Sequence, residues 1–252
     1  MNKNNKTVLV TGSEGFIGSY LVDELLHYGY CVLGIDDFSK YGRIARAHQS
    51  HPKFELYEFD ITTNQKKFED IIDNHKINYI INLASKVGGV SYFTANYGML
   101  ILENSLIDAI TYKQAIRAYQ KGDLERMVGM SSSMVFEQTE VFPTPETEAM
   151  NCVSPHTTYG FSKLHQEYIA KGCREQYNLP TTILRAFNCI GIGEQRAILD
   201  VETITSGNYK LMLSHVLPDV VVKTLLSNGN AIDLFTPGTQ RRAYTHGKSI
   251  AE

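Results

Sequence analysis

The sequence predicts an α/β fold, a doubly wound parallel sheet with helices on both faces and a small C-terminal lobe. Short apolar runs alternate with amphipathic stretches as far as residue 190, which is typical of parallel strands joined by helices. A glycine-rich turn follows the first run, and a carboxylate ends the second. The 252 residues, 43% of them hydrophobic, are enough for one well-buried domain.

Six short runs rich in apolar and β-branched residues are predicted as strands: Thr7–Thr11, Cys31–Asp36, Phe54–Phe59, Tyr79–Leu83, Arg126–Ser131 and Thr181–Arg185. Amphipathic stretches predict helices between them: Ile17–Tyr28, Thr63–His75, Asn96–Gln120 and Tyr159–Tyr177. After Gly191 the periodicity weakens, and we expect a helix, a strand and the start of a last helix: Val216–Ser227, Ala231–Phe235 and the final residues.

The composition excludes several classes of partner. A formal charge of −3 with no Lys/Arg block gives no basic surface for nucleic acid or anionic lipid. No apolar stretch is long enough to span a bilayer, and the polar residues 1–6 contain no apolar signal region. The four cysteines lie far apart without a CxxC pair, so neither a disulfide framework nor a metal site is indicated. We expect a cytoplasmic protein with a small-molecule partner.

The first chemical motif is a glycine loop, Thr11–Gly18, between the first strand and the first helix. Its three glycines, Gly12, Gly15 and Gly18, allow a tight turn and close approach of the backbone to a pyrophosphate. Asp36 ends the second strand, where a carboxylate can accept hydrogen bonds from an adenosine ribose. The following Asp37 would repel a 2′-phosphate, which favours NAD, although Lys40 and Arg43 leave NADP open. These features predict a dinucleotide-binding domain of the Rossmann type.

The second motif joins serines at the end of the fifth strand to a helix. Ser132 lies among Ser131–Ser133, and Tyr159 follows 27 residues later with Lys163 four positions beyond it. On a helix these two side chains share one face, so the ammonium is expected to stabilise a phenolate and lower the tyrosine pKa. The alternative is an ordinary surface pair, which the serines and the glycine loop disfavour.

With these residues the chain resembles the extended short-chain dehydrogenase/reductase family, in its branch of NAD-dependent nucleotide-sugar epimerases and dehydratases. The resemblance also includes Asp60-Ile61, Asn82-Leu83-Ala84 and Arg185-Ala186-Phe187-Asn188. It implies two sets of site residues. The cofactor would contact Gly12, Gly15, Phe16, Ile17, Gly18, Asp36, Asp60, Ile61, Ala84, Lys86, Tyr159 and Lys163. The substrate would contact Ser132, Ser133, Asn188, His215 and Arg242. Capping by Asp60 and Asn82, and a solvated Arg242, are the alternatives.

Two segments, Lys86–Val90 and Ser214–Pro218, resemble GDP-fucose synthase, whose histidine proton donor matches His215. The first also resembles GDP-mannose 3,5-epimerase. Both relatives use a cysteine two residues after the catalytic serine, where this chain has Met134, and a thioether cannot exchange protons. The branch's 4,6-dehydratases carry Asp-Glu where this chain has Ser133-Met134, which disfavours dehydration.

The family's Arg-Asp-Tyr segment reads Arg242-Ala243-Tyr244 here, and an aspartate expected soon after is Ser249. The family also continues further, so the chain is either unusually short or incomplete. We expect an NAD-binding domain over residues 1–190 and a partial substrate-binding region over 191–252, whose last strand and helix return to the first domain.

The resemblance implies an NAD-dependent nucleotide-sugar epimerase acting through a transient keto sugar, most commonly at C4. Tyr159 would take the hydroxyl proton, Ser132 would hold the oxygen and Lys163 would bind the nicotinamide ribose. One alternative is an NAD(P)-dependent nucleotide-sugar dehydrogenase or reductase resembling GDP-fucose synthase. A second is an NAD-binding protein with little catalytic activity.

The resemblance also implies a homodimer, because in this family the two long helices pair across a two-fold axis. Four apolar residues of the first of these helices are candidates for burial, either against the sheet or at that interface: Leu100, Ile107, Ile110 and Ile116.

Overall fold

The computed structural model describes residues 6–88, 93, 96–192, 216–232 and 242–252. Its main sheet is entirely parallel and has the order β3-β2-β1-β4-β5-β6. These strands are β1 (Thr7–Thr11), β2 (Cys31–Asp36), β3 (Phe54–Glu58), β4 (Tyr79–Asn82), β5 (Arg126–Ser132) and β6 (Thr181–Ala186). The order reverses between β1 and β4, so the predicted doubly wound α/β fold is confirmed.

The helices are α1 (Phe16–His27), α2 (Gln65–Asn74), α4 (Tyr97–Gln120), α5 (Thr158–Tyr177), α8 (Val216–Leu226) and α9 (Gly247–Ala251). Three short 3-10 helices cover Ala47–Ser50, Ser133–Phe136 and Glu146–Met150. The predicted elements before residue 190 and the helix at Val216 agree within two residues at each end. The strand predicted over Ala231–Phe235 is wrong at Ala231 and Ile232, which lie in no strand, and its other residues lie outside the described part. Within the described ranges, no helix is long and apolar enough to cross a bilayer.

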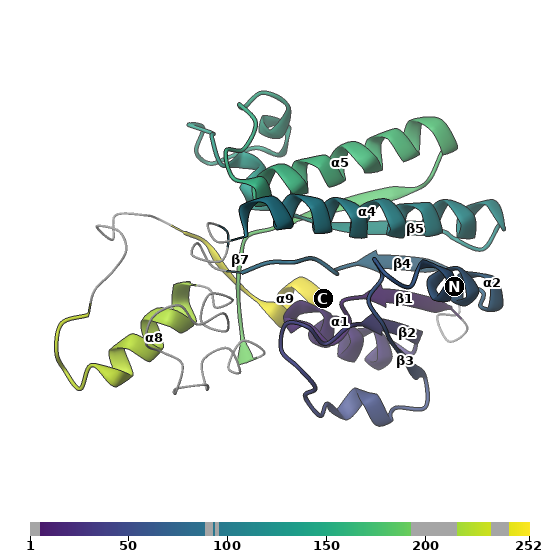
Figure 1. Cartoon of the computed structure of the whole chain (residues 1–252), viewed down its shortest axis with the longest axis horizontal. Coiled ribbons are helices and arrows are strands. Elements are labelled where there is room, and N and C mark those ends of the chain that lie inside the picture. The colour runs from purple at the N-terminus through teal and green to yellow at the C-terminus, as the bar shows by residue number, and fades with distance from the viewer. Residues whose placement is uncertain (1–5, 89–92, 94–95, 193–215, 233–241) are drawn as a thin grey trace.

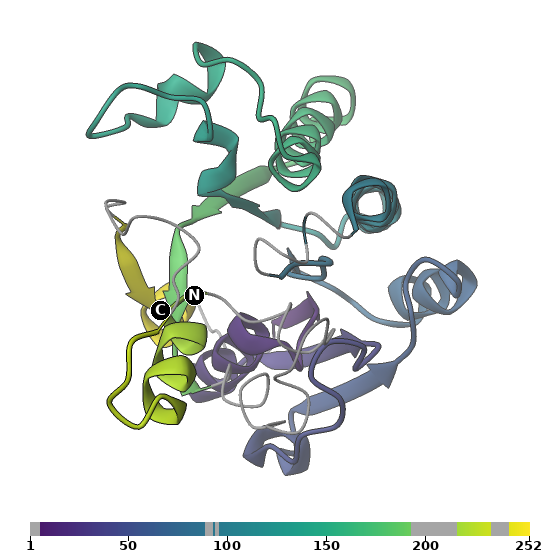
Figure 2. The same ribbon diagram turned by 60° about the vertical axis from the view of Figure 1, so that its left-hand side comes forward.

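Helices cover both faces of the sheet. Figure 2 shows α2, α4 and α5 on one face, with α1 and α9 on the other. Phe68 and Ile72 of α2 join Ile110 of α4 in the larger core, which reaches β1 through Leu9. On the opposite face, Val22 of α1 is buried in a second, smaller core. Burial on both faces explains why these strands appear as continuous apolar runs.

A second, two-stranded parallel sheet pairs β7 (Asn188–Ile190) with β8 (Tyr244–His246). Three-residue strands give too weak a pattern for sequence analysis, and neither was predicted. After β8 the chain packs on α1: the rings of His246 and Tyr20 are 5.3 Å apart, and Lys248 Nζ lies 3.6 Å from Glu24 Oε1. The end of the chain therefore lies beside α1, near the carboxyl edge of the main sheet (Figure 1).

The apolar residues of α4 divide between two faces. Leu100, Ile107 and Ile110 are buried within this chain, and Ile116 packs against the same core. Burial inside the protomer is therefore their role. The apolar surface that remains exposed on α4 instead includes Met99 and Leu102.

A buried charged cluster lies beneath the glycine loop. His48 is 4% exposed, and its Nε2 lies 3.1 Å from Glu14 Oε1 while its Nδ1 lies 2.9 Å from Asp23 Oδ1. Burial alone would lower the pKa of His48, but hydrogen bonds with Glu14 and Asp23 outweigh it and raise the pKa. Burial alone would raise the pKa of Glu14, and bonds from His48 and Gln49 lower it instead. The cluster ties the glycine loop to the segment before β3.

This cluster should make stability depend on pH. The raised pKa of His48 stabilises the fold fully below its ordinary value of 6.5, and this contribution is lost as the pH rises through the raised value. The lowered pKa of Glu14 stabilises above 4.5 and is lost as the pH falls through the lowered value. His48→Gln should lower the free energy of unfolding, measured in urea titrations, most between pH 4.5 and pH 6.5. The loss should be smaller at about pH 9. A loss that is the same at both pH values would contradict this account.

Candidate active site

The glycine loop lies where the strand order reverses, at the carboxyl ends of β1 and β4. Gly12 has a φ of +69°, and its N–H donates to Ile35 O at 2.8 Å. A Cβ on Gly12 would lie 2.9 Å from Ala84 N, and one on Gly18 would lie 2.0 Å from Gly12 O. Thr11 Oγ1 donates to Asn82 Oδ1 at 2.6 Å, which joins the two strand ends. Only glycine fits these two positions, as the motif predicted.

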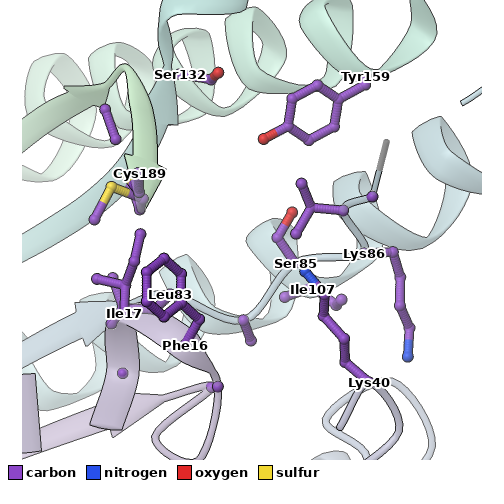
Figure 3. Close-up of a pocket in the computed structure, with 18 of the residues that line it drawn as sticks. Phe16, Ile17, Lys40, Leu83, Ser85, Lys86, Ile107, Ser132, Tyr159 and Cys189 are labelled. Carbon is purple, nitrogen blue, oxygen red and sulfur yellow. The ribbon is translucent and has the colours of Figure 1, made fainter. Parts of the chain in front are cut away.

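A cavity of about 690 Å³ extends from this loop to Tyr159 and Lys163 (Figure 3). Of the predicted site residues, the following line it: Gly12, Gly15, Phe16, Ile17, Gly18, Asp36, Asp60, Ile61, Ala84, Lys86, Ser132, Ser133, Tyr159, Lys163, Asn188 and Arg242. His215 lies outside the described residues. The structure thus brings all the described candidates to one cavity, and their individual roles remain predictions.

The loop end of the cavity has the groups that a dinucleotide requires. Helix α1 begins at Phe16, and its N-cap residue, Gly15, has no side chain to cap it. The first turn also has no acidic residue, so its backbone N–H groups can receive a pyrophosphate. Asp36 Oδ2 accepts from Glu14 N at 2.9 Å, and Oδ1 accepts from Phe38 N at 2.8 Å. These bonds orient the carboxylate, whose remaining lone pairs suit ribose hydroxyls. Asp60 Oδ1 accepts from Thr62 N at 2.8 Å, so Asp60 also stabilises a turn.

Lys86 links the loop after β4, in which it lies, to the loop after β2, beside the cavity. Its Nζ lies 3.2 Å from Asp37 Oδ2 and 3.0 Å from Ser39 Oγ. Asn104 of α4 holds the backbone of Lys86, accepting from its N–H at 2.7 Å and donating to its carbonyl at 3.1 Å. Lys86 is therefore held between the loops after β2 and β4, with its ammonium paired to Asp37.

Tyr159 and Lys163 lie near the start of α5. Thr157 caps this helix, because its Oγ1 accepts from Gly160 N at 3.1 Å. Figure 3 shows the hydroxyl groups of Ser132 and Tyr159 directed into the same space, with Cys189 across from them. Lys163 Nζ donates to Met130 O at 3.0 Å and lies 5.8 Å from the centroid of the Tyr159 ring.

The predicted effect of Lys163 on Tyr159 is not what the structure shows. Burial raises the pKa of Tyr159 to about 12, and a hydrogen bond with Ser132 only partly opposes this. The Lys163 ammonium is bonded to the Met130 carbonyl instead of to the phenol. Because desolvation disfavours the phenolate, Ser132 and not Lys163 is the neighbour that lowers the pKa of Tyr159 here.

Three further residues of this end of the cavity were not found from the sequence. The Phe93 ring stacks on Tyr159 with centroids 4.6 Å apart and planes at 13°. Glu137 Oε2 accepts from Thr157 N and Oγ1, both at 3.0 Å, and so braces the cap of α5. Cys189 lines the same cavity. The sequence signal for Cys189 was its position directly after the segment Arg185–Asn188.

The model of the NAD dependent epimerase/dehydratase family matches residues 8–252. The chain belongs to this family. The loop end of the cavity fits the family's cofactor, since its tight glycine turn, the uncapped N-terminus of α1 and Asp36 form a site for a dinucleotide. This protein therefore uses NAD, whose nicotinamide accepts the hydride when the cofactor is bound.

Two relatives match this chain over most of its length. Protein CapI of Staphylococcus aureus is 26% identical over 251 residues, which cover 97% of this chain and 67% of CapI. UDP-glucose 4-epimerase of Yersinia pestis is 32% identical over 192 residues, covering 73% of this chain and 53% of that enzyme. The chain thus spans between about half and two thirds of these relatives.

The fold also matches solved structures. UDP-N-acetylglucosamine 4-epimerase from Methanobrevibacter ruminantium M1, in complex with UDP-N-acetylmuramic acid, superimposes with a TM-score of 0.77 at 23% identity. The match covers 98% of this chain and 71% of that structure. At this level of identity the likeness supports the fold alone.

Proposed function

We propose that this protein is an NAD-dependent nucleotide-sugar epimerase that acts through a transient keto sugar, with C4 as the inverted carbon. The observation that carries the proposal is the single cavity that joins the glycine loop to Ser132, Tyr159 and Lys163. The family match and relatives named as UDP-glucose 4-epimerases support the reaction class.

Each catalytic residue has a task that its position allows. Tyr159 acts as the phenolate, a form that its hydrogen bond with Ser132 favours, and accepts the proton of the sugar hydroxyl. Ser132 holds that oxygen from the opposite side of the shared space. Lys163 reaches the cavity from α5 and binds the nicotinamide ribose. The surrounding apolar side chains, Phe93 and Val87 among them, pack on Tyr159 and exclude water from the reacting oxygen.

The nucleotide end of the substrate would lie near β7 and β8. Asn188 and Arg242 both line the cavity, and Asn188 Nδ2 donates to Ala243 O at 3.1 Å. This bond fixes the Asn188 amide beside the segment that holds Arg242. We propose that the amide and the guanidinium bind the substrate diphosphate, with Ser133 contacting the sugar.

The proposal is tested by measuring conversion of sugar nucleotides. A thermal-shift screen against UDP-, GDP-, CDP- and dTDP-sugars identifies the ligand. The protein should then interconvert two epimers of that sugar nucleotide with no added NADH and no steady change in nicotinamide absorbance. Stoichiometric production or consumption of NADH would instead select a dehydrogenase or reductase. Tight NAD binding without turnover of any sugar nucleotide would select a binding protein.

We also propose a homodimer formed by α4 and α5. These helices expose apolar side chains on their outer faces, including Leu102 at 65% and Tyr168 at 66% exposure, with Met99, Leu106 and Phe161 nearby on the same helices. Exposed apolar residues on two adjacent helices that run in the same direction suit a two-fold four-helix contact. Light scattering at micromolar concentration should give twice the chain mass, and a monomer mass would remove this proposal.

A further inference from the structure

Helix α4 carries a carboxylate that the proposed reaction does not use. Asp108 is 2% exposed, and its Oδ1 accepts from Asn82 Nδ2 at 2.8 Å and from Gln166 Nε2 at 2.7 Å. A buried carboxylate is costly unless it is hydrogen-bonded and its charge is compensated. The two amides supply hydrogen bonds but no charge, so the compensating charge must come from elsewhere.

That charge lies on the neighbouring helix. Gln166, which binds Asp108, is one helical turn beyond Lys163 on α5. Lys163 is 4% exposed and donates to the neutral Met130 carbonyl. A buried ammonium bonded to a carbonyl also lacks a compensating charge. The two helices therefore bring together one buried anion and one buried cation.

Of the described groups around Asp108, Lys163 is the one whose positive charge can compensate the carboxylate. Lys163 acts on Asp108 as a charge, whereas Tyr112 on α4 and Tyr159 on α5, which also interact with Asp108, are neutral because burial raises their pKa values. The strands contribute the Asn82 amide from β4 and the Met130 carbonyl from β5.

We propose that Asp108 is a positioning residue of the active site, whose carboxylate is the buried counter-ion that keeps the Lys163 ammonium charged and in place. Burial lowers the pKa of Lys163, and the field of Asp108 opposes this. Burial raises the pKa of Asp108 to about 6, and the Lys163 charge and the hydrogen bonds from Gln166 and Asn82 oppose this rise and favour the carboxylate. The inference rests on the proposed function for the catalytic task of Lys163, whereas the charge of Lys163 is measured without turnover.

Asp108→Asn tests the inference, because it removes the charge and keeps an oxygen that can accept from Asn82 and Gln166. The full chain, without added nucleotide, is treated with acetic anhydride over a range of pH, and acetylation of Lys163 is followed by mass spectrometry. Only the neutral amine reacts. We expect Lys163 to react at least about tenfold faster at neutral pH in the variant, which corresponds to a pKa lower by about one unit. The exposed Lys171 provides the internal reference. An unchanged rate at Lys163 would overturn the proposal.

The matched control is Thr111→Val, which removes a buried polar group from the same helix without changing its charge. Acetylation of Lys163 should stay at the parent rate in this control, and an equal acceleration would assign the effect to packing and overturn the proposal. Should Asp108→Asn fail to fold, Gln166→Met provides the second variant. Losing this donor raises the pKa of Asp108 further and reduces its charge at neutral pH. A smaller acceleration in the same direction is expected, and none would overturn the proposal.

Discussion

Tyr159→Phe should bind NAD and the sugar nucleotide nearly as well as the parent but lose turnover by ~10² to 10⁴, the range typical of a general base. The variant keeps the ring that packs against Phe93 and removes the hydroxyl that shares a hydrogen bond with Ser132. Binding and proton transfer should therefore separate. Calorimetry measures the first, and kcat for epimer interconversion measures the second.

Two variants control this result. Tyr168→Phe removes a hydroxyl from an exposed tyrosine of the same helix and should leave kcat unchanged. Lys163→Ala should weaken NAD binding and turnover together, because the lysine lines the cofactor cavity as well as adjoining Tyr159. Near-normal turnover by Tyr159→Phe would contradict the mechanism whichever net reaction the protein catalyses.

Gly18→Ala should weaken NAD binding by about 10- to 100-fold, since overpacking of this kind costs ~1–3 kcal/mol. A Cβ at this position would lie 2.0 Å from Gly12 O, so the backbone of the glycine loop or of α1 must move. Either movement displaces the N–H groups that would receive the pyrophosphate. Calorimetric titration with NAD measures the loss.

Gly172→Ala is the matched control, because it adds the same methyl group to α5, where no atom other than the nearby backbone of that helix and the adjacent residues lies within 4 Å. It should bind NAD normally and gain ~0.5–1 kcal/mol of stability from better helix propensity. Titrating the parent with NADP in the same experiment should show weaker binding, because Asp36 and Asp37 both line the adenosine end of the cavity. Unchanged NAD affinity in Gly18→Ala would contradict the role given to the loop.

The sequence patterns predicted the sheet well because its strands are buried on both faces and its helices are amphipathic. The ends of β1 and β2 agree with prediction to the residue, and Gly12 and Gly18 stand where their backbone or packing leaves no room for a side chain. The spacing of their motifs likewise predicted that Ser132 and Tyr159 share one site, and both line the same cavity. In each case the physical requirement is local to a turn, a helix face or a strand end.

The rest depends on contacts between distant segments. β7 pairs with β8 across more than fifty residues, which no local pattern records. Tyr159 is buried among side chains from the loop after β4, from α4 and from the 3-10 helix after β5. This burial raises its pKa, which the spacing of Tyr159 and Lys163 alone could not indicate. Asp108 stands in the middle of a helix, where a carboxylate is usually solvated. Its burial becomes evident only from the packing of α4 against α5.

The pairing of β7 with β8 also affects how the molecule tolerates changes in length. Asn188 aligns with Tyr244, so the chain between them is anchored at both ends beside the cavity. The entropy of closing such a segment grows only with the logarithm of its length, and doubling it costs about 0.6 kcal/mol. An insertion in the glycine loop would instead disrupt the 2.8 Å hydrogen bond from Gly12 N–H to Ile35 O. A change in length between these two anchors should therefore cost far less stability than one in the glycine loop.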